Sequence, residues 1–115
     1  QSKSDSSLSL QIRNACDYIS LHIREKLSMD VLAKEAGYTE YYFSHKFKQE
    51  MGVSVADYIR REKVRQAKLL LSGTKMNIQE ISDELNFGSR SYFSSTFQKE
   101  AGMSPSEYRE RNRKE

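Results

Sequence analysis

Apolar residues recur along this chain at intervals of three and four, which is the spacing of one face of an α-helix. The first apolar stripe consists of Ile12, Ala15, Cys16, Ile19 and Ile23. The alternation of β-branched and polar residues that indicates a strand is absent from the sequence. The pattern therefore predicts an all-α fold with seven helices.

Capping residues and glycines set the expected limits of these helices. We predict helices at about residues 9–25, 28–37, 40–52 and 54–71, one starting at 77, one at about 89–101 and one starting at 104. Asn77 and Ser104 are each followed three residues later by a glutamate, Glu80 and Glu107. This spacing predicts a capping box, in which side chain and backbone bond reciprocally, at both helix starts.

The sequence contains an internal repeat with a period of 50 residues. Residues 42–61 match residues 92–111 at nine of twenty positions, whereas upstream the offset is 49, because the second copy has one extra residue within 88–90. The residues that recur from the first copy are Tyr42, Phe43, Ser44, Phe47, Glu50, Gly52, Ser54, Tyr58 and Arg61. Each copy consists of a short helix, a tight turn, a second helix and a capped helix start. This order is typical of helix-turn-helix units, whose second helix enters the major groove of DNA.

The second helix of each copy has an apolar and a polar face when its residues are placed 100° apart. Phe43 and Phe47, like Phe93 and Phe97, are expected to face the core. The polar faces carry Tyr41, Ser44, His45, Lys48 and Gln49 in the first copy, and Arg90, Ser91, Ser94, Ser95, Gln98 and Lys99 in the second. Such side chains suit base edges and phosphates, although either face alone could be an ordinary polar surface. Because the pattern occurs twice, we favour DNA contact.

Positive charge is concentrated in the middle of the chain, whose overall net charge is only +3. Residues 58–75 contain six basic residues and a single acidic one; the basic residues are Arg60, Arg61, Lys63, Arg65, Lys68 and Lys75. A local positive band attracts a polyanion, and the alternative is a solvated helix face. A connecting helix of about 18 residues is roughly 27 Å long, against about 34 Å between neighbouring major grooves. We expect it to hold the two second helices in successive grooves, with Arg61 near a phosphate.

These observations predict a division into four segments. Residues 1–7 are a disordered linker remnant, 8–53 the first helix-turn-helix subdomain, 54–72 the connecting helix and 73–115 the second subdomain. No apolar run is long enough to span a membrane, and no signal segment is recognisable. The single cysteine, Cys16, is expected in the core and fits a reducing cytoplasm.

Catalytic and metal-binding signals are missing from the sequence. His22 and His45 stand alone, without the clustered ligands that zinc requires. Neither a glycine-rich phosphate loop nor a nucleophile paired with a base is recognisable. We therefore expect no enzyme activity, no metal and no cofactor.

Two motifs resemble the AraC/XylS family of bacterial transcription regulators. Residues 32–48 resemble the family's first helix-turn-helix, and residues 91–99 with 102–109 resemble its C-terminal signature. The resemblance covers about residues 10–112 and implies the C-terminal DNA-binding domain, with two helix-turn-helix subdomains joined by a long central helix. It implies base contacts of double-stranded DNA from Tyr41, Ser44, His45, Arg90, Ser91, Ser94 and Ser95. It implies phosphate contacts from Thr39, Lys48, Ser89 and Lys99.

Two residues depart from the family pattern. Asn86 replaces the usual glycine of the second turn, and because asparagine tolerates the left-handed conformation we expect no break there. Ser95 stands where many members have a larger polar residue, so base reading by the second unit is expected to depend mainly on Arg90.

Family members also carry a sensing or dimerisation domain, which is expected to be missing from this fragment. RNA polymerase is a candidate for a second partner, and a membrane is not expected as a partner. The alternative function is a helical protein–protein interaction module that uses the tyrosine-rich face of the third helix.

Overall fold

The computed structural model describes residues 8–113, and the predicted linker remnant at 1–7 lies outside the described residues. The chain divides into two compact units, one ending at Ile59 and the other starting at Arg60. Each unit is described below by itself. Within residues 8–113 all regular secondary structure is helical.

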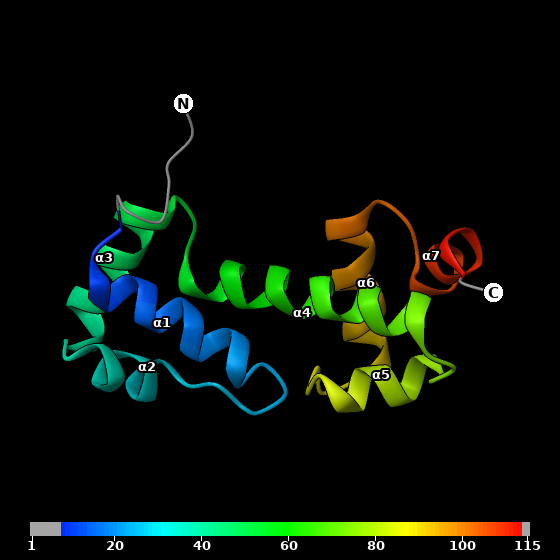
Figure 1. Cartoon of the computed structure of the whole chain (residues 1–115), viewed down its shortest axis with the longest axis horizontal. Coiled ribbons are helices and arrows are strands. Elements are labelled where there is room, and N and C mark those ends of the chain that lie inside the picture. The colour runs from blue at the N-terminus through cyan, green and yellow to red at the C-terminus, as the bar shows by residue number, and fades with distance from the viewer. Residues whose placement is uncertain (1–7, 114–115) are drawn as a thin grey trace. The chain divides into compact units, whose positions relative to one another are not determined.

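The described residues form seven α-helices, as predicted (Figure 1). The helices are α1 (Leu10–Leu21), α2 (Met29–Ala36), α3 (Glu40–Met51), α4 (Val55–Gly73), α5 (Ile78–Glu84), α6 (Arg90–Ala101) and α7 (Pro105–Asn112). The first turn of α4 belongs to the first unit and the rest of α4 to the second.

The core of the first unit is built from α1, α2 and α3. Ile12 and Ile19 of α1, Leu32 of α2, and Phe43 and Phe47 of α3 are at most 1% exposed. In Figure 1, α1 and α2 run side by side, and α3 follows α2 after a short turn. Burying a side chain of this size contributes about 1.5–3 kcal/mol, so these contacts fix which face of α3 remains outside.

The core of the second unit repeats this plan with the main part of α4 in the place of α1. The buried stripes of the two helices have the same spacing, Ile12–Ala15–Ile19 in α1 and Val64–Ala67–Leu71 in α4. Phe93 and Phe97 of α6 are fully buried, like Phe43 and Phe47. The repeat therefore also includes the helix that precedes each helix-turn-helix, α1 or α4, which the sequence comparison did not detect.

Helix α1 ends earlier than predicted, at Leu21 and not near residue 25. His22 leaves the helical conformation (φ −113°, ψ 25°), and its Nδ1 lies 2.9 Å from the Glu25 carboxylate. Ile23 is nevertheless buried, so the apolar spacing that predicted a longer helix fits a turn as well.

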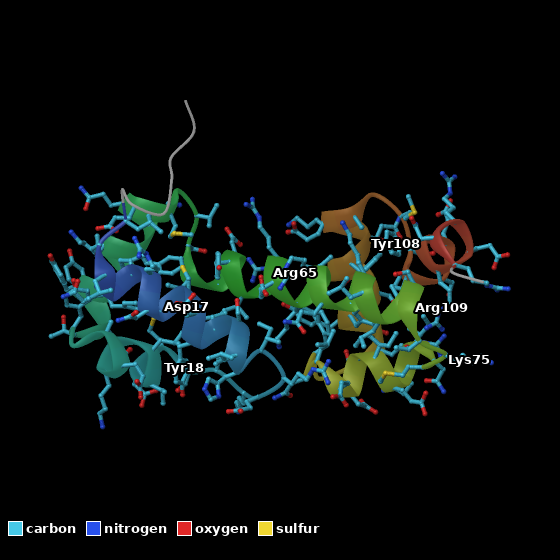
Figure 2. All side chains as sticks on the ribbon, viewed as in Figure 1. Asp17, Tyr18, Arg65, Lys75, Tyr108 and Arg109 are labelled. Atoms are coloured by element: carbon cyan, nitrogen blue, oxygen red, sulfur yellow. The ribbon has the colours of Figure 1, made fainter. Side chains whose placement is uncertain are left out.

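Helix α4 runs to Gly73, two residues further than predicted. Its C-terminal end is held by Arg109 of α7, whose guanidinium donates to the carbonyl oxygens of Leu71 (2.9 Å) and Thr74 (3.2 Å). Figure 2 shows Arg109 beside this end of the helix. A partner 38 residues away leaves no local signal in the sequence.

The two predicted capping boxes differ in the structure. Asn77 and Glu80 form both reciprocal hydrogen bonds at the start of α5, as predicted. At α7 the Ser104 hydroxyl accepts from the backbone N–H of Glu107 (3.1 Å), but the Glu107 carboxylate pairs with Arg111 (3.4 Å). Arg111 lies one helical turn further on and offers the carboxylate a charged partner, so the prediction is wrong for the glutamate half of this box.

Candidate nucleic-acid interface

The turn between the two helices of each helix-turn-helix unit has the same hydrogen bonding. Gly37 (φ 80°) and Asn86 (φ 57°) both adopt the left-handed conformation. The residue after each donates its N–H to a carbonyl of the first helix, Tyr38 to Ala33 (2.9 Å) and Phe87 to Ser82 (3.0 Å). This pattern closes helix C-termini and satisfies their last carbonyls. The expectation that Asn86 would continue the turn without a break is confirmed.

Aromatic contacts orient α3 and α6 in their units in the same way. The ring centroids of Phe43 and Phe47 are 5.8 Å apart, and those of Phe93 and Phe97 are 5.9 Å apart. Phe47 meets Tyr58 edge-on at 5.5 Å, and Phe97 meets Tyr108 edge-on at 5.6 Å. With their apolar sides fixed inward, both helices turn their polar sides outward.

The outer face of α3 presents the residues that the sequence assigned to it. Tyr41 is 75% exposed, His45 and Lys48 are exposed and Ser44 is half-buried. The ring of His45 lies 4.1 Å from that of Tyr41, and its Nδ1 is 2.9 Å from the carbonyl oxygen of Tyr41. The structure therefore brings the predicted base-contacting residues Tyr41, Ser44 and His45 together on one surface.

The outer face of α6 carries three serines, which are shorter than the Tyr41 and His45 of α3. Arg90, Ser91, Ser95 and Lys99 are exposed and Ser94 is half-buried. The Ser95 hydroxyl donates to the carbonyl oxygen of Tyr92 (3.3 Å), so its hydrogen is directed back to its own helix. Arg90, at the first residue of α6, is the long cationic side chain at the helix start.

Thr39 and Ser89, two predicted phosphate-contacting residues, are the N-caps of α3 and α6. The Thr39 hydroxyl accepts from the N–H of Tyr42 (3.2 Å), and that of Ser89 accepts from the N–H of Tyr92 (3.0 Å). Each hydroxyl accepts in these bonds and can still donate its own hydrogen, and the first backbone N–H groups of a helix favour anions. Thr39 and Ser89 can therefore cap their helices and bind an anion at the same time.

Lys63 of α4 is engaged in the second turn, a role that the sequence analysis missed. Its Nζ donates to the carbonyl oxygen of Asn86 (2.8 Å) and lies 5.3 Å from the centre of the Phe87 ring. Burial lowers the pKa of Lys63. The internal repeat is the one sequence feature that could have indicated this contact, because α4 has the same place in the second unit as α1 has in the first.

Other cations of the positive band also have partners inside the second unit. Arg61 lies 3.8 Å from the Glu100 carboxylate, Arg65 pairs with Glu62, and the Lys68 Nζ lies 5.8 Å from the Tyr108 ring centre. Arg61 remains 59% exposed, so the pair does not enclose it. The band is thus neither an open positive surface nor a merely solvated face, and only part of its charge is available to a polyanion.

The repeated glutamate of the first unit, Glu50, fastens the end of α3 to the start of α1. Its carboxylate accepts from the backbone N–H of Ser9 (2.8 Å) and pairs with Lys46 (3.1 Å). Partial burial works to raise the pKa of Glu50, but the hydrogen bonds from Ser9 and Lys46 outweigh it, so the pKa is lowered overall. Glu100 has the equivalent place in α6 and lies near Arg61 of α4. The two repeated glutamates thus each connect the second helix of a unit to the unit's first helix.

Comparison with known proteins places the chain in a family. A family model described as a helix-turn-helix domain matches residues 32–111. The arabinose operon regulatory protein of Escherichia coli is 38% identical over 101 residues, which cover 86% of this chain and 34% of that protein. The chain belongs to the AraC/XylS family. The region matched is the DNA-binding domain of transcription regulators, and sequence-specific DNA binding in transcription regulation is the function of this AraC/XylS domain.

Solved structures agree with this assignment. The C-terminal domain of AraT, a response regulator from Geobacillus stearothermophilus, superimposes with a TM-score of 0.88 at 30% identity, covering 94% of this chain and 90% of that one. The DNA-binding domain of AdpA, a global transcriptional factor solved in complex with a target DNA, has the same fold. Its TM-score is 0.84 at 22% identity, with 90% of this chain and 93% of that one covered.

The AraC/XylS domain is one part of longer proteins in this family. It spans about a third of the length of the curated arabinose regulators that it matches. The family consists of transcription regulators and is not a family of enzymes. Among the helices of residues 8–113, none combines the length and apolar character needed to cross a bilayer.

Proposed function

We propose that this AraC/XylS domain binds double-stranded DNA by inserting α3 and α6 into two successive major grooves. The observation that supports this most strongly is the repeat of the turn and aromatic geometry, which exposes a polar helix face in each unit. A single such face could be an ordinary surface. Two faces produced by the same internal contacts are what a domain with two DNA-reading helices requires.

Base reading in this proposal comes from the exposed faces of the two helices. Tyr41, Ser44 and His45 read bases from α3, and Arg90 reads a base from the start of α6. Ser91, Ser94 and Ser95 add short contacts to bases from the same face of α6. Because serine side chains are short and that of Ser95 donates to its own helix, the second unit depends mainly on Arg90.

Phosphate contacts come from residues at the ends of the two helices and from α4. We assign them to Thr39 and Lys48 in the first unit, and to Ser89, Lys99 and Arg61 in the second. Because Arg61 lies near Glu100, its phosphate contact competes with an internal ion pair.

The domain acts by binding alone in this proposal, without a catalytic step or cofactor, in the cytoplasm of a bacterium. A sensing or dimerisation domain elsewhere in the full protein controls it, and RNA polymerase is the second partner. The length of the curated relatives supports the presence of a further domain, because their chains are about three times as long as the stretch matched here.

Selection from a random duplex library at near-physiological salt tests the proposal. Two enriched sequence blocks about one helical turn (roughly 10 base pairs) apart are expected. Arg90→Ala should weaken the consensus of one block, and Ser44→Ala combined with His45→Ala that of the other. A single enriched block would refute the two-groove arrangement, and no enrichment at any salt would refute DNA reading by this domain.

The exposure of Tyr41 (75%) and Tyr42 (49%) favours a second candidate, a protein-docking face on α3. Salt separates the two functions. Binding to random duplex DNA weakens steeply with salt when phosphates are contacted, whereas a protein-interaction module has no such affinity to lose.

A further inference from the structure

The imidazole of His45 has a defined hydrogen-bonding polarity in this structure. Its Nδ1 lies 2.9 Å from the carbonyl oxygen of Tyr41. A carbonyl oxygen can only accept, so Nδ1 must carry the hydrogen and donate it. In a neutral imidazole one ring nitrogen is a donor and the other an acceptor. The Nε2 of neutral His45 is therefore an acceptor without a hydrogen.

The same contacts aim this acceptor away from the protein. Because Nδ1 faces the helix backbone, Nε2 lies on the far side of the ring, on the exposed face of α3. The ring centroids of Tyr41 and His45 are 4.1 Å apart, so the tyrosine ring lies against the imidazole. Both partners belong to α3, so the arrangement exists before any DNA is bound and costs little ordering on binding.

We propose that His45 selects a base with an exocyclic amine on the DNA strand that α3 faces, namely cytosine or adenine, by accepting from that amine through Nε2. This inference rests on the proposed function, because it requires α3 in a major groove. In that groove cytosine presents its N4 amine and adenine its N6 amine as donors. Guanine presents two acceptors and thymine an acceptor and a methyl group, so neither has a hydrogen for Nε2.

Base selection with four proteins, all compared at about pH 8, tests the assignment. The proteins are the wild type, His45→Ala, His45→Arg and the control His22→Ala, which removes the other histidine of the sequence, outside the polar face of α3. The wild type and His22→Ala should prefer cytosine or adenine at one position of the first block. His45→Ala should lose this preference, and His45→Arg, which can only donate, should change it to guanine.

Removing the amine from the selected base isolates the hydrogen bond. A duplex with 2-pyrimidinone in place of cytosine, or purine in place of adenine, keeps the ring and lacks the donor. Wild-type affinity should fall about three- to tenfold, the value of a single hydrogen bond. The affinity of His45→Ala should not change. Equal losses in both proteins would show that another group reads the amine and would overturn the proposal.

The outcomes distinguish this inference from the function on which it rests. Enriched blocks whose base preference is the same for all four proteins would overturn the role of His45 and leave DNA reading intact. Guanine or thymine preferred by the wild type would also overturn it. No enriched blocks at all would refute the proposed function, and this inference with it. A nitrogen NMR spectrum of the imidazole groups in the free protein adds a direct check, because it should show the proton of His45 on Nδ1.

Discussion

The left-handed residue of the first turn, Gly37, allows a direct test of what the turn requires. Its φ is 80°, a conformation that L-amino acids with a side chain rarely adopt. The second unit has Asn86 at the equivalent place, with φ 57°. We therefore compare Gly37→Ala with Gly37→Asn in the first unit, and Asn86→Ala with Asn86→Gly in the second.

The structure separates backbone strain from crowding at Gly37. A Cβ added there would meet no other atom within 4 Å, so a clash contributes nothing. The left-handed conformation costs an alanine about 1–2 kcal/mol. Loss of glycine's freedom in the unfolded chain returns about 0.4–1 kcal/mol. Gly37→Ala should thus lower the free energy of unfolding by about 1 kcal/mol, and Gly37→Asn by clearly less, because asparagine tolerates this conformation.

Urea denaturation followed by circular dichroism measures these differences. Asn86→Ala should cost about as much as Gly37→Ala, and Asn86→Gly should be close to neutral. The reasoning would be refuted if Gly37→Ala were as stable as the wild type. It would also be refuted if asparagine at position 37 were as harmful as alanine, because strain would then not be the cause.

Four further changes test the DNA contacts and the internal ties. Arg90→Ala should cost about 1–3 kcal/mol on the selected site and relax one base pair; an equal loss on random DNA would contradict its base-reading role. Lys48→Ala should weaken all sequences alike and lower the salt slope by about one in filter-binding titrations, and a changed base preference would contradict that. Lys63→Met should lower the free energy of unfolding by about 1 kcal/mol, measured with urea, because the hydrogen bond to the Asn86 carbonyl is lost. An unchanged midpoint of urea denaturation would show that this hydrogen bond does not stabilise the domain. Because the pKa of Glu50 is lowered in the folded state, its stabilisation is present above the ordinary value of 4.5 and lost as the pH falls below it. The melting temperature of Glu50→Gln should therefore lie below the wild type's at about pH 7 and approach it at about pH 3, whereas a constant gap would show that the charge is not responsible.

Most of the fold could be predicted from local signals. Glycines at 37, 52 and 102 and the caps Thr39, Asn77 and Ser89 placed the helix ends correctly, because each acts on its own neighbours. The errors arose where a distant or competing partner decides. Arg109 extends α4 from 38 residues away, and His22 ends α1 although Ile23 keeps the apolar spacing.

The candidate site was predictable as a surface but not as a set of hydrogen bonds. Helical periodicity turned Tyr41 and His45 outward, and both are exposed. The hydrogen bond from His45 to the Tyr41 carbonyl depends on the rotamer of the histidine side chain, which the sequence pattern does not predict. The positive band was predicted from a count of charges. Such a count cannot show which cations have partners inside the domain, such as Lys63 with the Asn86 carbonyl.

The internal engagement of the α4 cations bears on how such a regulator finds its site in a genome. A cation that neutralises a phosphate adds the same affinity to a correct site and to every incorrect one. A genome presents on the order of a million to a billion incorrect sites, so affinity of this kind sequesters the protein away from its operator. Lys63 and Arg65 stabilise the second unit and contribute less to that sequestration. In the proposed function, the engagement of these two cations lowers the affinity for every site alike, so the base-reading side chains account for a larger share of the affinity for the operator.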